Sequence, residues 1–213
     1  MSIENFGLFA LAAFLLNITP GNDFIYVATR SLSQGIRAGI ISSLGIGAGL
    51  IIHVSVSVLG LSAILAKSAF AFNLIKYIGA GYLIYVGIKM IFSKTISPDE
   101  IKTSSEKKNS SWIIFRQGFF TNVFNPKVAL FFLSFLPQFA DMHSPYFSSQ
   151  LALLGAWFIF SGTLVSIAIA LIFGKLRNWL SSFHSFWKLQ QKIAGTVLIV
   201  LGLKIAFMQR HLK

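Results

Sequence analysis

Two short polar segments carry the residues of this chain that could do chemistry. They are residues 19–23 (TPGND) and residues 122–127 (NVFNPK), and each interrupts a long apolar stretch. Each contains a proline, which removes a backbone donor and disrupts the preceding helical turn. Backbone groups opened by such a break need partners inside the protein or in a water-filled cavity. The pattern predicts either two breaks that form a binding site or, more simply, two kinks.

Asp23 is the acidic residue of the first segment. If the surrounding apolar stretch spans a membrane, an ionised side chain there is costly and usually faces a partner or an aqueous path. Asp23 could then take up and release a proton, or bind the ammonium group of a substrate. The alternative is that Asp23 lies just beyond the span and pairs with Arg30 or Arg37 at the surface.

Lys127 is the basic residue of the second segment, and we expect it to be the one basic residue well inside a span. If the two segments meet, Lys127 could form an ion pair with Asp23 that opens when a substrate or a proton binds. It could instead contact a substrate carboxylate, helped by the positive N-terminal end of the half-helix after Pro126. The alternative is a lysine that snorkels to the membrane interface. The candidate residues for binding a substrate or a proton are Asn17, Pro20, Gly21, Asp23, Asn122, Asn125, Pro126 and Lys127.

The composition predicts the elements that position these residues. Hydrophobic residues make up 55% of the 213 residues and charged residues 11%, whereas a soluble domain carries about 25% charged residues. A membrane helix needs about 20 apolar residues. Runs of this kind cover residues 6–18, 38–66, 72–92, 112–139, 151–173 and 193–207. We therefore expect an all-α, multi-pass membrane protein with about six transmembrane helices and a single domain over residues 1–213.

The basic residues indicate topology rather than nucleic-acid binding, although the formal net charge is +12. They concentrate in alternate connecting segments, which the positive-inside rule assigns to the cytoplasm. This orientation puts the N-terminus outside and leaves Lys67 and Lys76, among others, in outer segments. The chain has no cysteine, so disulfides and thiolate metal sites are excluded, and we expect no cofactor and no metal.

The hydrophilic stretch at residues 94–111 divides the chain into two similar halves. Residues 79–92 parallel residues 194–207, with the glycine, lysine and final phenylalanine in the same places, and both halves contain an asparagine shortly before a proline. A unit of three spans has its ends on opposite sides of the membrane, so its second copy must insert upside down. We predict inverted repeats at residues 1–93 and 112–213, joined by a cytoplasmic linker, a plan common in secondary transporters.

The remaining motifs have simpler interpretations. Gly45 and Gly49 are spaced for close helix packing, either within the chain or at the seam of a homodimer. His53 is predicted to be a hydrogen-bonded packing residue more readily than a proton relay. The sequence contains no Walker A motif and no hydrolase motif such as G-x-S-x-G, so we expect neither an ATPase nor an enzyme.

The polar segments, together with their flanks, resemble the LysE/RhtB family of bacterial amino-acid exporters. The resemblance is carried by residues 19–23 with the sequence RSLSQGIRAG at 30–39, and by FRQGFFTNVFNPK at 115–127 with FLPQF at 135–139. Asn22 stands where members of the family usually have a second proline. The resemblance implies proton-driven export of amino acids or similar small metabolites across the bacterial inner membrane, without a cofactor. A passive channel and a membrane enzyme are the alternatives from other classes. The scarcity of polar residues along the spans argues against both.

Overall fold

The computed structural model describes residues 6–61, 69–92, 110–142, 144–175 and 184–207. These residues form helices and connecting turns, and none of them lies in a strand. The α-helices are α1 (Phe6–Ile18), α2 (Asn22–Gln34), α3 (Ile36–Val56), α5 (Ala69–Phe92), α7 (Ser111–Val123), α8 (Pro126–Leu130), α9 (Phe147–Lys175) and α11 (His184–Phe207). Two π-helical turns, η1 (Ser57–Leu61) and η2 (Phe131–Phe135), and a 3₁₀ turn, η3 (Leu136–Phe139), extend α3 and α8. The all-α prediction is confirmed for this part of the chain.

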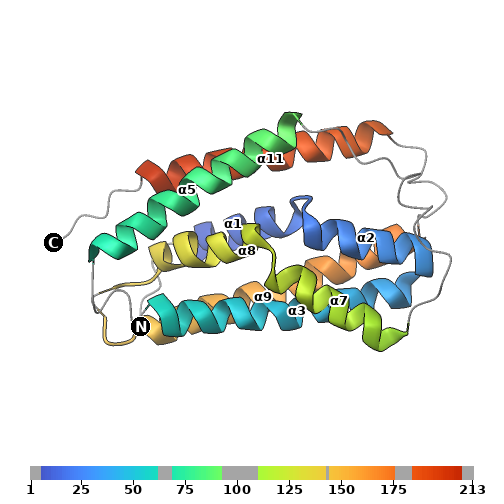
Figure 1. The fold of residues 1–213 in the computed structure, drawn as a ribbon, viewed down its shortest axis with the longest axis horizontal. Coiled ribbons are helices and arrows are strands. Elements are labelled where there is room, and N and C mark those ends of the chain that lie inside the picture. The colour runs from blue at the N-terminus through green and yellow to red at the C-terminus, as the bar shows by residue number, and fades with distance from the viewer. Residues whose placement is uncertain (1–5, 62–68, 93–109, 143, 176–183, 208–213) are drawn as a thin grey trace.

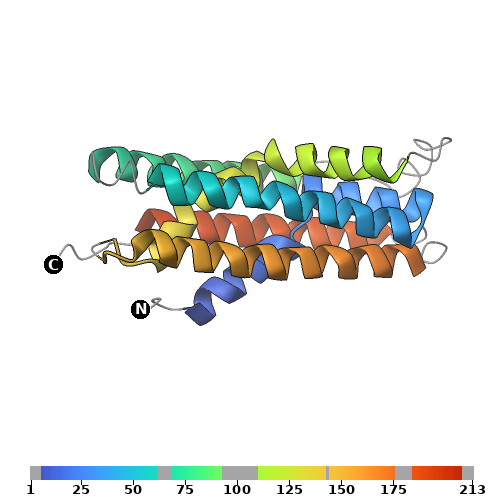
Figure 2. The ribbon, with the colours of Figure 1, turned by 90° about the horizontal axis from the view of Figure 1, so that it is seen from below.

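The helices run roughly along one direction and pack in layers (Figures 1 and 2). Helices α5 and α11 lie side by side and form one outer layer. Helix α3 packs against α2, α7 and α9 on the other side of the molecule. The broken pair α1–α2 and the short helix α8 lie between these two layers in the view of Figure 1.

Two helix pairs are bent where the sequence predicts breaks. Helices α1 and α2 meet at an angle of 51°, and α7 meets the segment Pro126–Phe139 at 45°. Pro20 and Pro126 each lack the N–H that would continue the helical hydrogen bonds. Asn125 caps the new helix α8, because its side-chain oxygen accepts a hydrogen bond of 3.1 Å from the Lys127 N–H. The sequence therefore ends one helix and starts another at each break.

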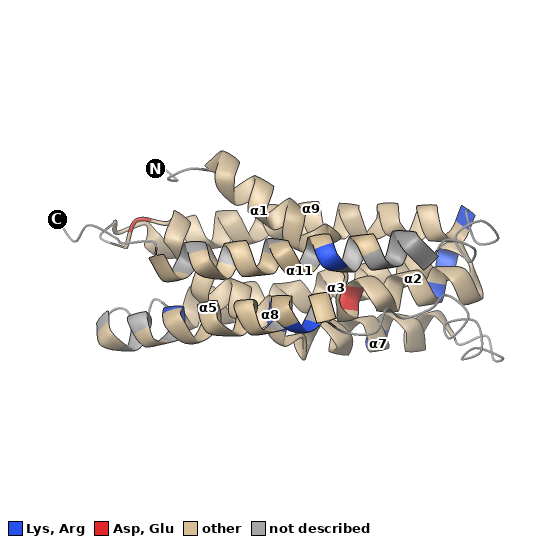
Figure 3. Cartoon of the chain, turned by 90° about the horizontal axis from the view of Figure 1, so that it is seen from above, with Lys and Arg blue, Asp and Glu red and all other residues tan. Residues whose placement is uncertain are grey.

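Part of the described chain is long and apolar enough to cross a membrane. By length and composition, Ile36–Gly60 and Phe147–Lys175 each qualify, and the two bent pairs raise the total to 4 candidate spans. Helices α5 and α11 run beside them with 24 residues each, or about 36 Å at 1.5 Å per residue. Figure 3 shows few charged residues along these helices.

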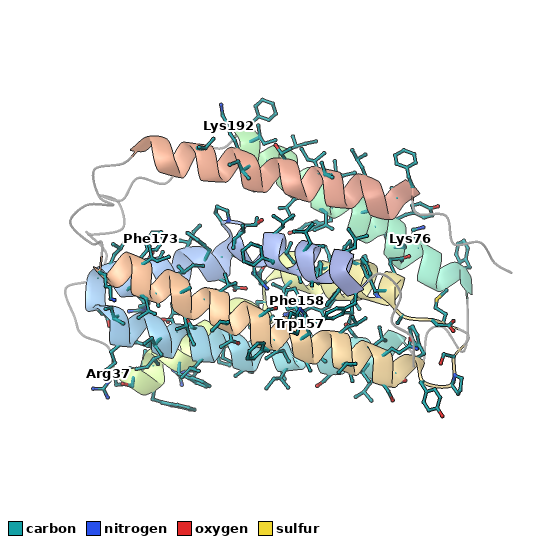
Figure 4. All side chains as sticks on the ribbon, turned by 180° about the vertical axis from the view of Figure 1, so that it is seen from behind. Arg37, Lys76, Trp157, Phe158, Phe173 and Lys192 are labelled. Carbon is teal, nitrogen blue, oxygen red and sulfur yellow. The ribbon has the colours of Figure 1, made fainter. Side chains whose placement is uncertain are left out.

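Lys76 corrects one detail of the charge pattern. It was assigned to an outer segment, but it lies inside α5 and is only 7% exposed (Figure 4). Its ammonium lies 5.3 Å from the centre of the Tyr77 ring. The apolar run predicted at residues 72–92 already includes this position, so the helix and not an outer segment is its correct place. Lys127 is therefore not the only basic residue within a predicted span.

Glycines allow the helices to approach closely, as predicted for Gly45 and Gly49. A Cβ on Gly45 would collide with the backbone oxygen of Phe115 in α7, and one on Gly49 would lie 2.8 Å from the Asn122 Cβ. Small residues of this kind let helix backbones pack in direct contact. Packing within the chain, between α3 and α7, accounts for both glycines.

Helices α5 and α11 pack antiparallel through glycines as well. A Cβ on Gly87 would lie 2.5 Å from the Gly195 oxygen, and one on Gly202 would lie 2.7 Å from the Ala80 oxygen. Residue numbers at the contact therefore rise along α5 while they fall along α11, as in an antiparallel pair. These two helices are the counterparts in the two predicted repeats.

The interior contains phenylalanine rings, and large apolar side chains also cover the outside. Phe131 and Phe158 are almost fully buried, with ring centres 5.0 Å apart. Outward-facing Phe70 and Phe92 are 77% and 83% exposed. Large exposed apolar surfaces mark contact with another protein or with lipid, and lipid is the partner that fits a set of candidate membrane spans.

Candidate functional site

The two breaks lie against each other, and Lys127 bridges them. Its ammonium donates hydrogen bonds to the backbone oxygens of Leu16, at 3.3 Å, and Thr19, at 3.2 Å. Leu16 lies in the last turn of α1 and Thr19 directly follows the helix, where backbone carbonyls are no longer all used by the next turn of the helix. The C-terminal end of a helix carries partial negative charge, which favours a cation there. Lys127 thus points into the bundle, which does not fit the alternative of a lysine that snorkels to an interface.

Gly21 provides the space for this lysine. A Cβ at Gly21 would lie 3.1 Å from the Lys127 ammonium nitrogen. The backbone of Gly21 is extended, with φ of −168°, a conformation open to any residue. Space, rather than backbone conformation, is therefore the physical reason for a glycine at this position.

Asp23 lies in the first turn of α2, at the other side of the same break. The N-terminal end of a helix carries partial positive charge, which favours an anion. One carboxylate oxygen, Oδ2, accepts a hydrogen bond of 2.8 Å from the Asn122 side chain in α7. The other oxygen, Oδ1, is buried and has no hydrogen-bond partner. One oxygen of the Asp23 carboxylate is therefore hydrogen-bonded, and the other is buried without a partner.

Asp23 and Lys127 are neighbours, but their hydrogen bonds go to other groups. Lys127, Asn122, Asn125 and His53 are the polar and charged groups around the Asp23 carboxylate. The two residues are therefore nearby opposite charges rather than a hydrogen-bonded ion pair. Asn122 holds Asp23, and backbone oxygens at the end of α1 hold Lys127. Arg30 does not pair with Asp23 either, because it donates to the Gln117 side chain and lies 5.4 Å from the centre of the Tyr26 ring.

His53 supports the second break from α3. Its Nε2 lies 2.9 Å from the Asn122 backbone oxygen, and since a carbonyl only accepts, Nε2 carries the proton of this hydrogen bond. The ring stacks on Phe132, with centres 6.0 Å apart. His53 is thus a hydrogen-bonded packing residue, as predicted, and it fixes the residue that holds Asp23.

A small cavity of about 30 Å³ lies beside the first break. Its polar lining residues are Asp23 and Lys127, together with an asparagine and two residues that carry hydroxyl groups. Its apolar wall comes from α1, α2, α3, α8 and α9. The lining residues are Leu16, Asn17, Thr19, Asp23, Phe24, Ile46, Leu50, Lys127, Val128, Phe158, Gly162, Ser166 and Ile169.

The structure places the predicted site residues in three positions. Asn17, Asp23 and Lys127 line the cavity. Asn122 and Asn125 lie behind it, as a carboxylate partner and a helix cap. Pro20, Gly21 and Pro126 form the breaks and do not line the cavity. All eight come from the two breaks and their flanks, so the expectation that the breaks meet agrees with the structure.

Thr19 and Ser166 line the cavity as well, and the sequence analysis did not select them. Thr19 belongs to the first polar segment, and its proximity to Pro20 was a usable signal. Ser166 lies in α9, where a lone serine within an apolar helix carries no signal of its own. Among the described residues, no group of three potential metal ligands occurs.

Comparison with known proteins identifies the family of the chain. The family model of the LysE type translocator matches residues 14–209, which include both breaks. This chain is a member of the LysE type translocator family. Family membership places it among translocators.

Two relatives of this LysE type translocator cover almost its whole length. It is 33% identical to the uncharacterized membrane protein YrhP of Bacillus subtilis, over 90% of this chain and 93% of that protein. It is 27% identical to a homoserine/homoserine lactone efflux protein of Salmonella typhimurium, over 97% of this chain and 98% of that protein. No solved structure matches the chain.

Proposed function

We propose that this translocator exports an amino acid or a similar small metabolite from the cytoplasm across the bacterial inner membrane, in exchange for protons. The observation that carries this proposal is the cavity at the two helix breaks, which one acidic residue, Asp23, and one basic residue, Lys127, both line. The efflux activity named for the Salmonella relative, which aligns along almost the whole chain, supports the direction of transport.

The two charges match the two charges of an amino acid. The free oxygen of Asp23 can accept a hydrogen bond from a substrate ammonium group. The Lys127 ammonium can exchange a backbone oxygen of α1 for a substrate carboxylate, and charge-assisted hydrogen bonds of this kind are about twice as strong as neutral ones. A zwitterion therefore neutralises the site at both ends.

Coupling to protons follows from competition for Asp23. A buried carboxylate without a cation is costly within a membrane. Either the substrate ammonium or a proton can neutralise it, but both cannot occupy the same oxygen at once. A substrate carried outward would then be replaced by a proton carried inward, and the proton gradient would drive export.

The site must change shape during transport. A cavity of about 30 Å³ is small beside ligand pockets, which measure roughly 300–1,000 Å³. Binding therefore requires the helices around the breaks to separate. Their short half-helices provide the means, because each break is a place where backbone angles can change without breaking a continuous helix.

We further propose six membrane spans in two inverted repeats, at residues 1–93 and 112–213, with a cytoplasmic linker at 94–111. Under the sequence match, Gly87 corresponds to Gly202 and Ala80 to Gly195. The contact of Gly87 with Gly195 then corresponds to that of Gly202 with Ala80, as a two-fold axis between the halves requires. In secondary transporters with this plan, the binding site lies where the repeats meet. The linker lies outside the described residues.

Efflux from proteoliposomes tests the function. Purified protein is reconstituted, the vesicles are loaded with a mixture of radiolabelled amino acids, and release is followed with and without a pH gradient. Saturable release of one or a few amino acids that the gradient accelerates supports the proposal. Release that neither saturates nor responds to the gradient would indicate a passive channel, and no release above protein-free vesicles would reject amino-acid transport.

A further inference from the structure

We propose that Asn17 is a specificity-determining residue, which donates a hydrogen bond to an oxygen on a neutral substrate side chain. This inference rests on the proposed function, because it assumes that the cavity binds an amino acid. It goes further by assigning the class of side chain and the group that recognises it.

The charges of the cavity exclude a charged side chain. Among the residues that line it, Asp23 is the only acidic one and Lys127 the only basic one. The ammonium and carboxylate groups common to all amino acids use both. A second charge on the substrate would remain without a partner in a site surrounded by Phe24, Leu50 and Phe158, which is unfavourable within a membrane protein. The site therefore fits a neutral side chain.

Asn17 offers a donor that the protein itself does not use. It lies in α1, on the wall of the cavity, and its amide nitrogen Nδ2 is buried with no hydrogen-bond partner. Buried polar groups in proteins are nearly always hydrogen-bonded, so such an exception calls for a ligand or a water molecule. An oxygen on the substrate side chain would supply the missing acceptor.

Helix α9 is shaped around this amide. A Cβ on Gly162 would lie 3.1 Å from the Asn17 Oδ1 and 3.2 Å from its Nδ2, so a larger residue there would displace the amide. Ser166, one turn later on the same face of α9, also lines the cavity and adds a hydroxyl group. The side-chain end of the site is thus polar at Asn17 and Ser166 and apolar elsewhere.

The unpaired Nδ2 of Asn17 would let the site distinguish substrate side chains that have the same shape but differ in whether they carry an acceptor. An apolar side chain would enclose Nδ2 without giving it an acceptor. Sites that use a hydrogen bond to recognise a substrate reject the analogue that lacks it far more strongly than apolar pockets reject a similar shape. Threonine and valine differ in this way, with a hydroxyl in place of a methyl group.

Ligand-induced thermal stabilisation of the detergent-purified protein tests the assignment without requiring transport. Titration with threonine, valine and lysine gives three apparent dissociation constants. We expect the wild type to bind threonine at least roughly tenfold more tightly than valine, and lysine most weakly. In Asn17→Leu, which keeps a similar size but removes the donor, the ratio of threonine to valine affinity should fall to about one.

Two further variants complete the design. Gly162→Ala, which presses on the same amide, should lower the ratio as well, and it serves as the test if Asn17→Leu does not fold. Ser161→Ala removes a hydroxyl from α9 that bonds to Phe158 O and does not line the cavity, so it should keep the ratio of the wild type.

The outcomes separate this inference from the proposed function. If no amino acid stabilises the wild type or is released from proteoliposomes, both fail together. If amino acids bind but threonine and valine bind equally, or if Asn17→Leu keeps the preference for threonine, the assignment of Asn17 is overturned while the exporter remains. Tight binding of lysine would overturn the neutral side-chain class.

Discussion

The side-chain amide of Asn122 donates a hydrogen bond of 2.8 Å to Oδ2 of Asp23, across 99 residues of the chain. This bond joins the second helix break to the first. It satisfies one oxygen of the carboxylate and leaves the other, Oδ1, open. When a cation binds at Oδ1, a shift of the carboxylate would therefore move Asn122 and with it α7, which belongs to the second half of the chain.

Replacing Asp23 by asparagine should abolish gradient-driven efflux while the protein still inserts into the membrane. The substitution keeps the size of the side chain but removes the charge that binds an ammonium group or a proton. The measurement is efflux from proteoliposomes with and without a pH gradient, at matched protein content. Asp141→Asn, the same change in a turn outside the cavity, is the control and should transport like the wild type. Unchanged gradient dependence in Asp23→Asn would remove this residue from the mechanism.

Exchanging the two charges should not restore transport. In the double variant Asp23→Lys/Lys127→Asp, the new carboxylate would face the backbone oxygens of Leu16 and Thr19, which the Lys127 ammonium now contacts. Negative groups facing one another are unfavourable, so we expect the double variant to be as inactive as each single one. Recovery of efflux above the single variants would show instead that a direct ion pair is sufficient.

Gly21→Ala should weaken transport by displacing Lys127. The added Cβ would lie 3.1 Å from the ammonium nitrogen, so the lysine must move away from the end of α1. We expect a loss of apparent substrate affinity of roughly tenfold, corresponding to about 1.4 kcal/mol, measured from the concentration dependence of efflux. Gly81→Ala, where no atom lies within 4 Å of the added Cβ, is the matched control. Equal affinities in the two variants would argue against a role for the lysine position.

Gly45→Ala should destabilise the protein, because its Cβ would collide with the Phe115 oxygen in α7. A backbone atom cannot turn aside as a flexible side chain can, so α3 and α7 must separate. Overpacking of this kind typically costs about 1–3 kcal/mol. The melting temperature of the purified protein in detergent should fall relative to Gly60→Ala, whose Cβ would have open space. A melting temperature equal to that of the control would contradict the close contact.

Much of the fold could be predicted from the sequence because its signals are local. The apolar runs set the helices, and the bends occur at Pro20 and Pro126 because a proline acts on its own turn. The helix boundaries were less accurate. Helix α5 begins at Ala69, before the predicted run 72–92, because apolar residues before a predicted boundary extend a helix at little cost.

The sequence by itself determined that polar residues interrupt two apolar helices, since residue type and proline position are properties of the chain alone. The tertiary structure decided which polar atoms meet. Lys127 bonds to the end of α1 rather than to Asp23, and Asn17 lies opposite Gly162, because of how the bent helices cross. These contacts join segments that are more than 100 residues apart in the chain. The position of one helix against another depends on the packing of all their neighbours, and no local pattern contains it.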